Sequence, residues 1–262
     1  MKYNQALLKE IANARFEGVE TANLLLIGPQ QAGKSSFINS IISIAKGRKS
    51  NKTAALGRGD SVTERLLTVS GQGLRRKLRF KDTVGIIEAT HPDVTCDNIK
   101  QILVGDVKHR EMLYQGSRSY EKIESTYGPS KTTAHCVIFV IDANVLNTYK
   151  ENAHQGTIEF KIKNLMDKVK DMGIPFILVL TKIDQLCEEV ENDISVTFRS
   201  VGVKEAVDTA RRIFGFQEID IYPVKNYEKE TKMNPLMDML ILEAIRQAIN
   251  YSVDYLEDLQ EN

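Results

Sequence analysis

The chain has 262 residues, of which 42% are hydrophobic and 27% are charged. That composition is ordinary for a globular protein and allows a sizeable core. Lysine plus arginine and aspartate plus glutamate both number 35, so the near-zero net charge excludes a general attraction to nucleic acid or anionic membrane. Since no apolar run approaches the roughly 18 residues of a membrane span, no integral membrane segment is expected.

The first 18 residues are too polar for a signal peptide and predict an amphipathic helix. Leu7, Leu8, Ile11 and Ala14 fall near one face of this helix, and Gly18 is expected to end it. The three cysteines of the chain are far apart and show no paired spacing. Such cysteines are typical of free thiols in a reducing compartment.

Residues 28–35 read G-x-x-x-x-G-K-S, between an apolar run at 22–27 and a helical repeat at about 35–46. The glycines let the backbone curl so that N–H groups point at anionic oxygens, and the helix start adds the positive end of its dipole. Lys34 can place its ammonium on β- and γ-phosphates, and the Ser35 hydroxyl can ligate Mg²⁺. A chance match is the alternative, but the strand and helix on either side favour a P-loop. The residues expected to contact nucleotide here are Gly28, Gln31, Ala32, Gly33, Lys34, Ser35 and Ser36.

Strand-like and helix-like segments alternate along the rest of the chain. They predict an α/β fold of the P-loop NTPase type, with a mainly parallel central sheet, helices on both faces and one antiparallel hairpin strand. Strands are expected at 22–27, 63–70, 76–82, 135–142, 175–181 and 219–224, the second and third forming the hairpin. Helices are expected at about 35–46, 155–172, 202–214 and 235–257. The last begins at Asn234-Pro235, and a core-facing stripe runs from Leu236 to Ala248.

Residues 86–134 are more than a loop and one helix need. This polar segment is predicted to hold one or two helices, near 97–103 and 106–114. It is either an inserted surface elaboration or an enlarged switch region that senses nucleotide. We favour the switch region because the segment directly follows a second phosphate motif.

That motif is the D-x-x-G sequence of residues 82–85, which ends the third predicted strand. Carboxyl ends of parallel strands meet at one edge of a sheet, where open α/β folds bind ligands. Asp82 can hold the shell of a Mg²⁺ ion, and the Gly85 N–H can meet a γ-phosphate. A flexible segment after it can convert the presence of one phosphate into loop order.

Residues 181–184 read T-K-x-D after the next-to-last strand, with Thr181, Lys182 and Asp184 as candidate base contacts. A carboxylate can accept hydrogen bonds from the N1–H and amino group of guanine, which adenine does not offer in that geometry. Lys182 can lay its aliphatic stem across the base. A weaker signal follows the last strand, where Lys225 and Asn226 occupy a loop that could give a backbone N–H to guanine O6. The motif set predicts binding of GTP or GDP with Mg²⁺.

The order P-loop, D-x-x-G, T-K-x-D is that of TRAFAC-type GTP-binding domains, which the chain resembles from residue 22 to about 250. The segments LLLIGPQQAGKSSFINS, SVTERL, KDTVG and LTKID, with the C-terminal NPLMDMLILEAIRQAINYSVDYLEDL, look like the GTP-binding domain of the interferon-induced protein 44 family. The resemblance implies guanine-nucleotide binding in the cytoplasm, in an innate antiviral setting. Members often carry an extra N-terminal domain for which this chain lacks room, so we expect a short member or a fragment. One GTP-binding domain is expected over 1–262, with a helix at 1–18, the switch insertion at 86–134 and a helix at 235–257.

Thr53 and Thr63 both precede the second strand, and the resemblance selects Thr63 in SVTERL as the switch threonine that contacts Mg²⁺ and γ-phosphate. A strand-edge threonine without that role is the alternative. Lys34, Thr63 and Gly85 are then the expected catalytic residues. Ser35, Thr63 and Asp82 are the expected metal ligands.

Ile86 and Ile87 follow the D-x-x-G motif, where small GTPases often carry a glutamine that orients the attacking water. Isoleucine cannot do this, so hydrolysis should be slow or assisted by another residue, a partner or a second copy of the protein. The leading hypothesis is a GTP-binding switch whose output is contact with an effector or with itself. The alternatives are a non-hydrolysing nucleotide-binding scaffold and a P-loop kinase or ATPase, against which Lys182 and Asp184 argue.

Overall fold

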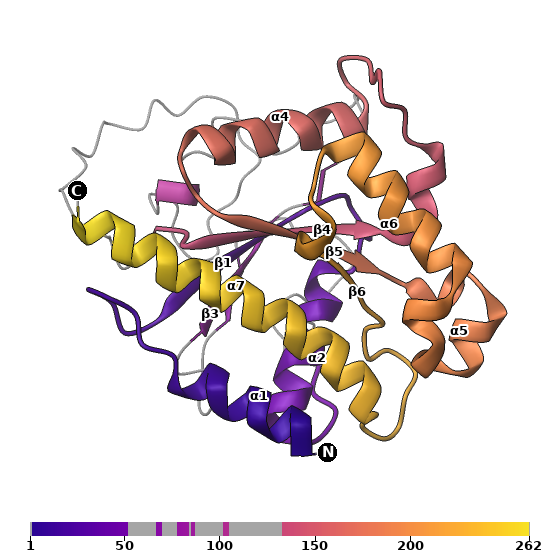
Figure 1. Cartoon of the computed structure of the whole chain (residues 1–262), viewed down its shortest axis with the longest axis horizontal. Helices are drawn as coiled ribbons and strands as arrows, with labels where there is room; N and C mark the ends of the chain where they lie inside the picture. Colours follow the sequence, from indigo (N-terminus) through magenta and orange to yellow (C-terminus); the bar gives the residue numbers. More distant parts are fainter. Residues whose placement is uncertain are drawn as a thin grey trace.

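A single sheet lies at the centre of the computed structural model, which describes residues 2–51, 67–69, 78–83, 85–86, 102–104 and 133–261 (Figure 1). Across the sheet, the strands of the described residues are β2 (Leu67–Val69), β3 (Leu78–Asp82), β1 (Ala22–Ile27), β4 (Cys136–Asp142), β5 (Phe176–Thr181) and β6 (Ile221–Pro223). All neighbouring pairs are parallel except β2 and β3, which are antiparallel. The predicted fold class, a mainly parallel sheet with one antiparallel hairpin strand, is confirmed.

The strand order reverses at β1. After β1 the chain first builds β3 on one side of it and later β4 on the other, so that Leu26 faces Asp82 on β3 and Ile138 on β4. In open α/β sheets, ligands bind outside the carboxyl ends of the strands at such a reversal. The topology therefore makes the loop that follows β1 the expected place for a ligand.

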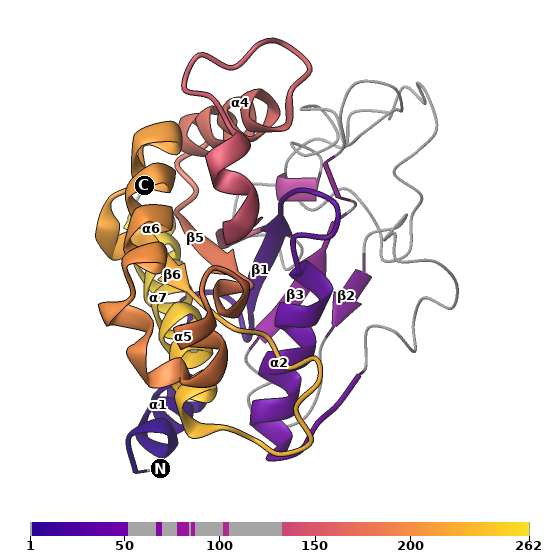
Figure 2. The same ribbon diagram turned by 90° about the vertical axis from the view of Figure 1, so that its right-hand side faces the viewer.

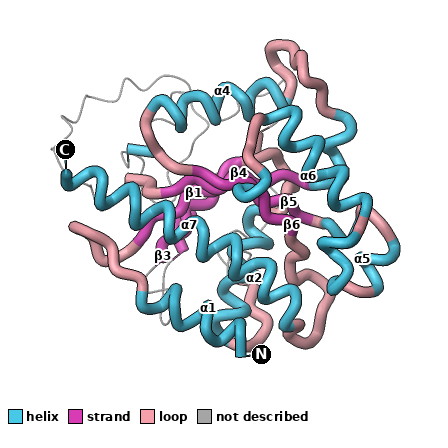
Figure 3. Tube along the Cα trace, viewed as in Figure 1, coloured by secondary structure: helices cyan, strands magenta, loops and turns pink. Residues whose placement is uncertain are grey.

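Helices cover both faces of the sheet. In Figures 1 and 2, α4 (Ile158–Asp171) and α6 (Val201–Phe214) lie along one face, and α2 (Lys34–Lys46) and α7 (Pro235–Glu261) lie along the other. Figure 3 shows the strands enclosed between these helices, with α1 (Lys2–Asn13) packed on α7.

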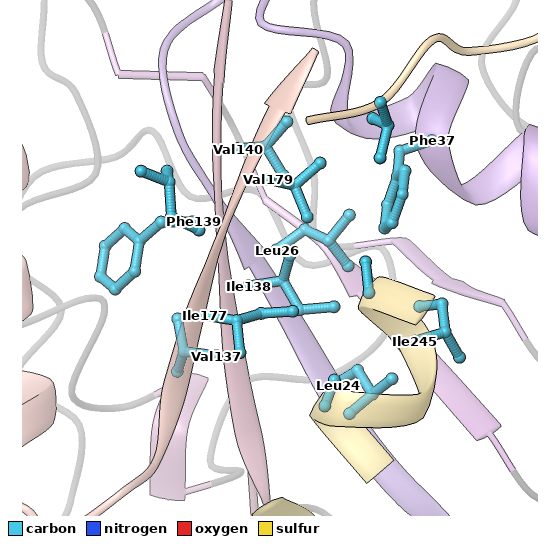
Figure 4. Close-up of a cluster of buried hydrophobic side chains, with 14 of the residues drawn as sticks. Leu24, Leu26, Phe37, Val137, Ile138, Phe139, Val140, Ile177, Val179 and Ile245 are labelled. Atoms are coloured by element: carbon cyan, nitrogen blue, oxygen red, sulfur yellow. The ribbon is translucent and has the colours of Figure 1, made fainter. Parts of the chain in front are cut away.

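The core is continuous on both sides of the sheet because β1 and β4 are apolar along almost their whole length, as expected for parallel strands between two helical layers. Figure 4 shows Leu26 and Ile138 facing Phe37 of α2 and Ile245 of α7, with Phe139 on the other side. The Phe139 ring makes edge-to-face contacts with the rings of Phe176 and Phe216, at centroid distances of 5.8 and 6.3 Å.

The N-terminal helix is shorter than predicted. It ends at Asn13, and the chain then turns back on itself at Gly18, where φ is +70° and Phe16 pairs with Val19. The expected apolar face is partly right, since Leu7 and Ile11 are buried whereas Leu8 and Ala14 are only partly buried. The helix is also held by a polar contact, in which the Asn4 side chain donates a 2.7 Å hydrogen bond to the Pro235 carbonyl.

The last helix begins where predicted and continues four residues further than expected, to Glu261. Asn234 caps it, because its side-chain oxygen accepts a 2.9 Å hydrogen bond from the Leu236 N–H. Leu236 itself is 38% exposed and so does not belong to the predicted core stripe; Met237 is buried instead.

Most other differences between the predicted and the observed secondary structure concern short elements. Sequence periodicity did not indicate α5 (Glu188–Asn192), nor the 3-10 helices η2 (Ala143–Thr148), η3 (Ile183–Gln185), η4 (Ile194–Arg199) and η5 (Glu218–Asp220), because each is too short to show a repeat. The helices expected near 97–103 and 106–114 lie outside the described residues, apart from a helical stretch at 102–104. Within the described parts of the chain, no helix has both the length and the apolar character needed to cross a membrane.

The packing of α1 on α7 predicts that Ile11→Ala destabilises the whole fold. Ile11 is 1% exposed, and truncating a buried isoleucine costs about 2–5 kcal/mol of unfolding free energy. Urea unfolding measures the loss, with Lys9→Ala on the exposed face of α1 as the matched control. Equal stabilities of the two variants would mean that α1 is not part of the cooperative unit.

Candidate nucleotide-binding site

The loop between β1 and α2 needs glycine at two positions for two different reasons. A Cβ atom on Gly28 would lie 1.9 Å from the Val140 carbonyl oxygen of β4, so the loop leaves the sheet with no room for a side chain. Gly33 has φ +91°, a conformation that L-residues rarely adopt, and directly precedes the first residue of α2. Gln31 also has a positive φ of +62°. These constraints curl residues 28–33 around the N-terminus of α2.

Lys34 lies over this loop rather than in solvent. Its Nζ donates hydrogen bonds to the carbonyl oxygens of Gly28 and Pro29, at 2.9 and 2.8 Å, and the residue is 6% exposed. Burial lowers the pKa of the ammonium to about 8, although the nearby Asp82 carboxylate acts in the opposite direction. The group therefore remains mainly protonated at neutral pH and can serve as a positive charge for an anionic ligand.

Ser35 and Asp82 come together at the start of α2. The Ser35 hydroxyl donates a 2.5 Å hydrogen bond to Oδ2 of Asp82, and within the described structure Oδ1 of the same buried carboxylate has no hydrogen-bond partner. Burial raises the pKa of Asp82, whereas the Lys34 charge and the Ser35 hydrogen bond lower it. A hydroxyl and a carboxylate with a spare oxygen are the donors that Mg²⁺ prefers, so these residues fit that ion.

The D-x-x-G segment is hydrogen-bonded to the P-loop. The Ile86 N–H donates to the Gly28 carbonyl and the Gln30 N–H donates to the Ile86 carbonyl, both at 3.0 Å. A Cβ atom on Gly85 would lie 2.4 Å from the Cα of Gln30, so this position also requires glycine. Ahead of it, the Thr83 hydroxyl donates to the Leu26 carbonyl at 2.7 Å. The two candidate phosphate elements thus form one packed unit.

The T-K-x-D segment touches the same loop from the side of β5. The Thr181 hydroxyl donates to the Ala32 carbonyl at 2.6 Å, which joins the end of β5 to the P-loop. Lys182 has φ +58°, and its Nζ lies 2.7 Å from Oδ2 of Asp142 at the end of β4. Sequence reasoning missed Asp142, although its place at the end of the neighbouring strand could have indicated it.

The loop after β6 completes the arrangement. Lys225 Nζ lies 3.5 Å from the Asp184 carboxylate and 3.3 Å from that of Glu230. Burial alone would raise the pKa of Glu230, but backbone N–H groups and Lys225 lower it, which keeps this carboxylate ionised. The Asn226 amide donates to the Gly33 carbonyl at 3.3 Å, so this loop also contacts the P-loop. No short motif could have indicated Glu230.

The structure therefore gathers almost all the predicted site residues at one edge of the sheet. The P-loop follows β1, Asp82 and Gly85 follow β3, and the T-K-x-D and β6 segments contact the P-loop through side chains. Ser36 lies in the first turn of α2, where its carbonyl accepts a hydrogen bond from the Ser40 hydroxyl. Thr63 lies outside the described residues, so its role in binding metal and phosphate stays a prediction.

Comparison with known sequences identifies relatives of this chain. A family model described as "50S ribosome-binding GTPase" matches residues 23–182. The chain is 30% identical to interferon-induced protein 44-like of Homo sapiens over 98% of this chain and 58% of that protein. It is 31% identical to interferon-induced protein 44 of Mus musculus over 93% of this chain and 58% of that protein. The chain thus spans little more than half the length of these relatives, and the predicted resemblance is confirmed.

Solved structures show the same fold. The chain is similar to a dimerisation-deficient mutant of Toc33 from Arabidopsis thaliana, at 16% identity and a TM-score of 0.56, over 96% of this chain and 93% of that one. It is also similar to Toc33 in complex with GDP and Mg²⁺, at 17% identity and a TM-score of 0.54, with the same coverage. At such identities the likeness concerns the fold alone.

The contact between Gly28 and β4 predicts a clear stability effect. Gly28→Ala places a methyl group against the Val140 carbonyl, which must displace backbone and should lower the unfolding free energy by about 1–3 kcal/mol or more. Gly202→Ala is the matched control, because its added Cβ meets nothing closer than 3.7 Å and α6 gains helix propensity. Thermal unfolding of both variants measures the difference. A stable Gly28→Ala protein would contradict this account of the loop.

Proposed function

The chain belongs to the GTPase family whose model it matches over more than half its length, and on that premise we propose that it binds GTP and GDP with Mg²⁺ and hydrolyses GTP slowly. Its output would be a contact that depends on which nucleotide is bound, made with an effector protein or with a second copy of the chain. This is the switch behaviour that one phosphate can impose on a neighbouring segment.

The observation that carries the proposal is that the segments expected to bind phosphate and the segments expected to surround a base all contact one loop, the P-loop. Thr181 and Asn226, from the two segments that would surround a base, both donate side-chain hydrogen bonds to carbonyls of the P-loop. A ligand with its phosphates on that loop would therefore have its base near Asp184. The Asp184 carboxylate offers the acceptors that guanine needs and adenine cannot use.

Each residue of the phosphate side has a proposed role. Lys34 would bind the β- and γ-phosphates, Gly85 would donate its N–H to the γ-phosphate, and Thr63 would close over both phosphate and metal. Ser35, Thr63 and Asp82 would hold Mg²⁺, directly or through water. The ion would neutralise the charge that develops on the phosphates during hydrolysis.

The proposed setting is an innate immune one, because the relatives are named for their induction by interferon. We place the protein in the cytoplasm, since Cys136 and Cys187 are free thiols that suit a reducing compartment. Self-association is part of the proposal. In a structural relative of the same fold, dimerisation is described as important for the GTPase activity of chloroplast translocon components.

One observation favours a second candidate function, a nucleotide-binding scaffold without turnover. Ile86, at the position where small GTPases often carry the water-orienting glutamine, is apolar and 2% exposed. A protein that holds GTP without converting it could still present a nucleotide-dependent surface to a partner.

A turnover assay separates the two candidates. Purified protein with Mg²⁺ and GTP should produce GDP, and Lys34→Ala should abolish this activity because it removes the buried ammonium from the phosphate loop. GDP is quantified by chromatography at several protein concentrations, and Lys204→Ala on the exposed side of α6 serves as the control. Bound GTP that stays unconverted at every concentration would support the scaffold instead.

The proposed base contact predicts a change of nucleotide preference. Asp184→Asn should lower GTP affinity by about 10- to 100-fold, because two hydrogen bonds to a charged acceptor are lost. The variant should gain affinity for xanthosine triphosphate, whose carbonyl can accept from the asparagine amide. Calorimetric titration with GTP, ATP and xanthosine triphosphate measures both effects, with exposed Asp208→Asn as the matched control. Equal affinity of the wild type for ATP and GTP would rule out guanine recognition.

A further inference from the structure

The side chain and the backbone of residue 86 both have structural roles in this chain. The Ile86 side chain is 2% exposed, its N–H donates to Gly28, and its carbonyl accepts from Gln30. Neither its side chain nor its backbone polar groups are therefore left to hold a water molecule. If the proposed GTP hydrolysis occurs within one copy of the chain, the group that orients the water must come from another residue.

The same pairing fixes Gln30 next to Gly85. A Cβ atom built on Gly85 would lie 2.4 Å from the Cα of Gln30, 2.7 Å from its nitrogen and 2.9 Å from its Cβ. The Gln30 side chain thus leaves the backbone beside the residue whose N–H is proposed to meet the γ-phosphate. Gln30 is half-buried, and among the described residues its side-chain amide makes no hydrogen bond.

Several other polar groups near this point already make hydrogen bonds. The Thr83 hydroxyl donates to the Leu26 carbonyl, Ser35 donates to Asp82, and Lys34 donates to two carbonyls of the loop. Gln31 follows Gln30 directly but is exposed, and its backbone turns into the left-handed conformation. Gln30 therefore combines a fixed backbone, an amide that makes no hydrogen bond to the described residues, and a place beside Gly85.

We propose that Gln30, in the P-loop, is the catalytic residue that orients the attacking water, in place of residue 86. The assignment rests on the proposed function, since it requires a γ-phosphate at Gly85. The side-chain carbonyl of Gln30 accepts a hydrogen bond from the water, and its NH₂ group donates to a γ-phosphate oxygen. A glutamine amide has both groups at one end, which lets it hold the two reactants together.

The step is hydrolysis of GTP to GDP. A lone pair of the water oxygen forms the new bond to the γ-phosphorus, and the bond from that phosphorus to the β–γ bridging oxygen breaks with its electron pair left on GDP. Both water protons leave on the phosphate product as dihydrogen phosphate. Gln30 positions the water and takes no proton permanently, so no other reactant is needed.

The first test is the kinetics of Gln30→Ala. Single-turnover hydrolysis should fall by about 100-fold, which is the lower end of the effect of a positioned catalytic group, while GTP affinity stays within about twofold of wild type. Gln30→Glu, which keeps an acceptor and loses the donor, should also hydrolyse slowly. Gln5→Ala on the exposed surface of α1 is the matched control and should behave as wild type.

The second test needs no turnover. GDP with aluminium fluoride imitates the phosphoryl group during transfer, and a water-orienting residue contacts that state more strongly than the ground state. Fluoride-dependent retention of fluorescent GDP should be present in the wild type and lost in Gln30→Ala, while binding of a non-hydrolysable GTP analogue is retained in both. A glutamine with a merely structural role would alter both complexes equally.

The outcomes separate the inference from the proposed function. If the wild type prefers GTP, and Gln30→Ala matches it in both turnover and fluoride-dependent binding, the role of Gln30 is overturned and GTP binding stands. Turnover that rises faster than protein concentration in both proteins would also overturn it, and would assign the missing group to a second copy. A wild type without affinity for GTP overturns the proposed function and this inference with it.

Discussion

The carbonyl oxygen of Gly28 is the contact on which the candidate site depends. It accepts hydrogen bonds from the Lys34 ammonium and from the Ile86 N–H, so one atom joins the P-loop lysine to the D-x-x-G segment. It can occupy that position only because Gly28 has no side chain and lies against the Val140 carbonyl of β4. The contact of the loop with β4, the curvature of the loop and the placement of the two motifs thus all depend on Gly28.

A second constraint is the burial of opposite charges at the start of α2. Burial acts against the charged forms of Lys34 and Asp82 and shifts both pKa values toward neutrality, whereas their mutual attraction opposes the shifts. Buried ions that lack full hydrogen bonding reduce stability. Among the described residues Oδ1 of Asp82 has no hydrogen-bond partner, so burial of this carboxylate lowers the stability of the fold at this point.

The sequence predicts an element of this structure well when a continuous run or repeat of apolar residues marks it, and poorly when the element is short or depends on contacts between distant residues. β1 could be predicted to the residue, and β4 and β5 to within one, because each is a continuous apolar run bounded by turn residues. The predicted site residues meet because their motifs follow strands whose carboxyl ends share an edge. Asp142 could have been noticed at the end of β4, but its partner Lys182 could not be predicted from the sequence, and neither could the role of Glu230, since both contacts are made only in the folded chain. The same limit explains α5 and the 3-10 helices, which local hydrogen bonds stabilise without an apolar repeat.

The pairing of Ile86 with the P-loop has a consequence for how such a protein can evolve. Its two hydrogen bonds involve backbone atoms alone, so they do not depend on which side chain occupies position 86. Any residue that keeps its backbone N–H and fits the buried pocket can be exchanged there without breaking the contact between the D-x-x-G segment and the P-loop. Selection could therefore vary the side chain at position 86 while the pairing of the two segments is left unchanged, because side-chain packing and backbone pairing depend on different atoms of the same residue.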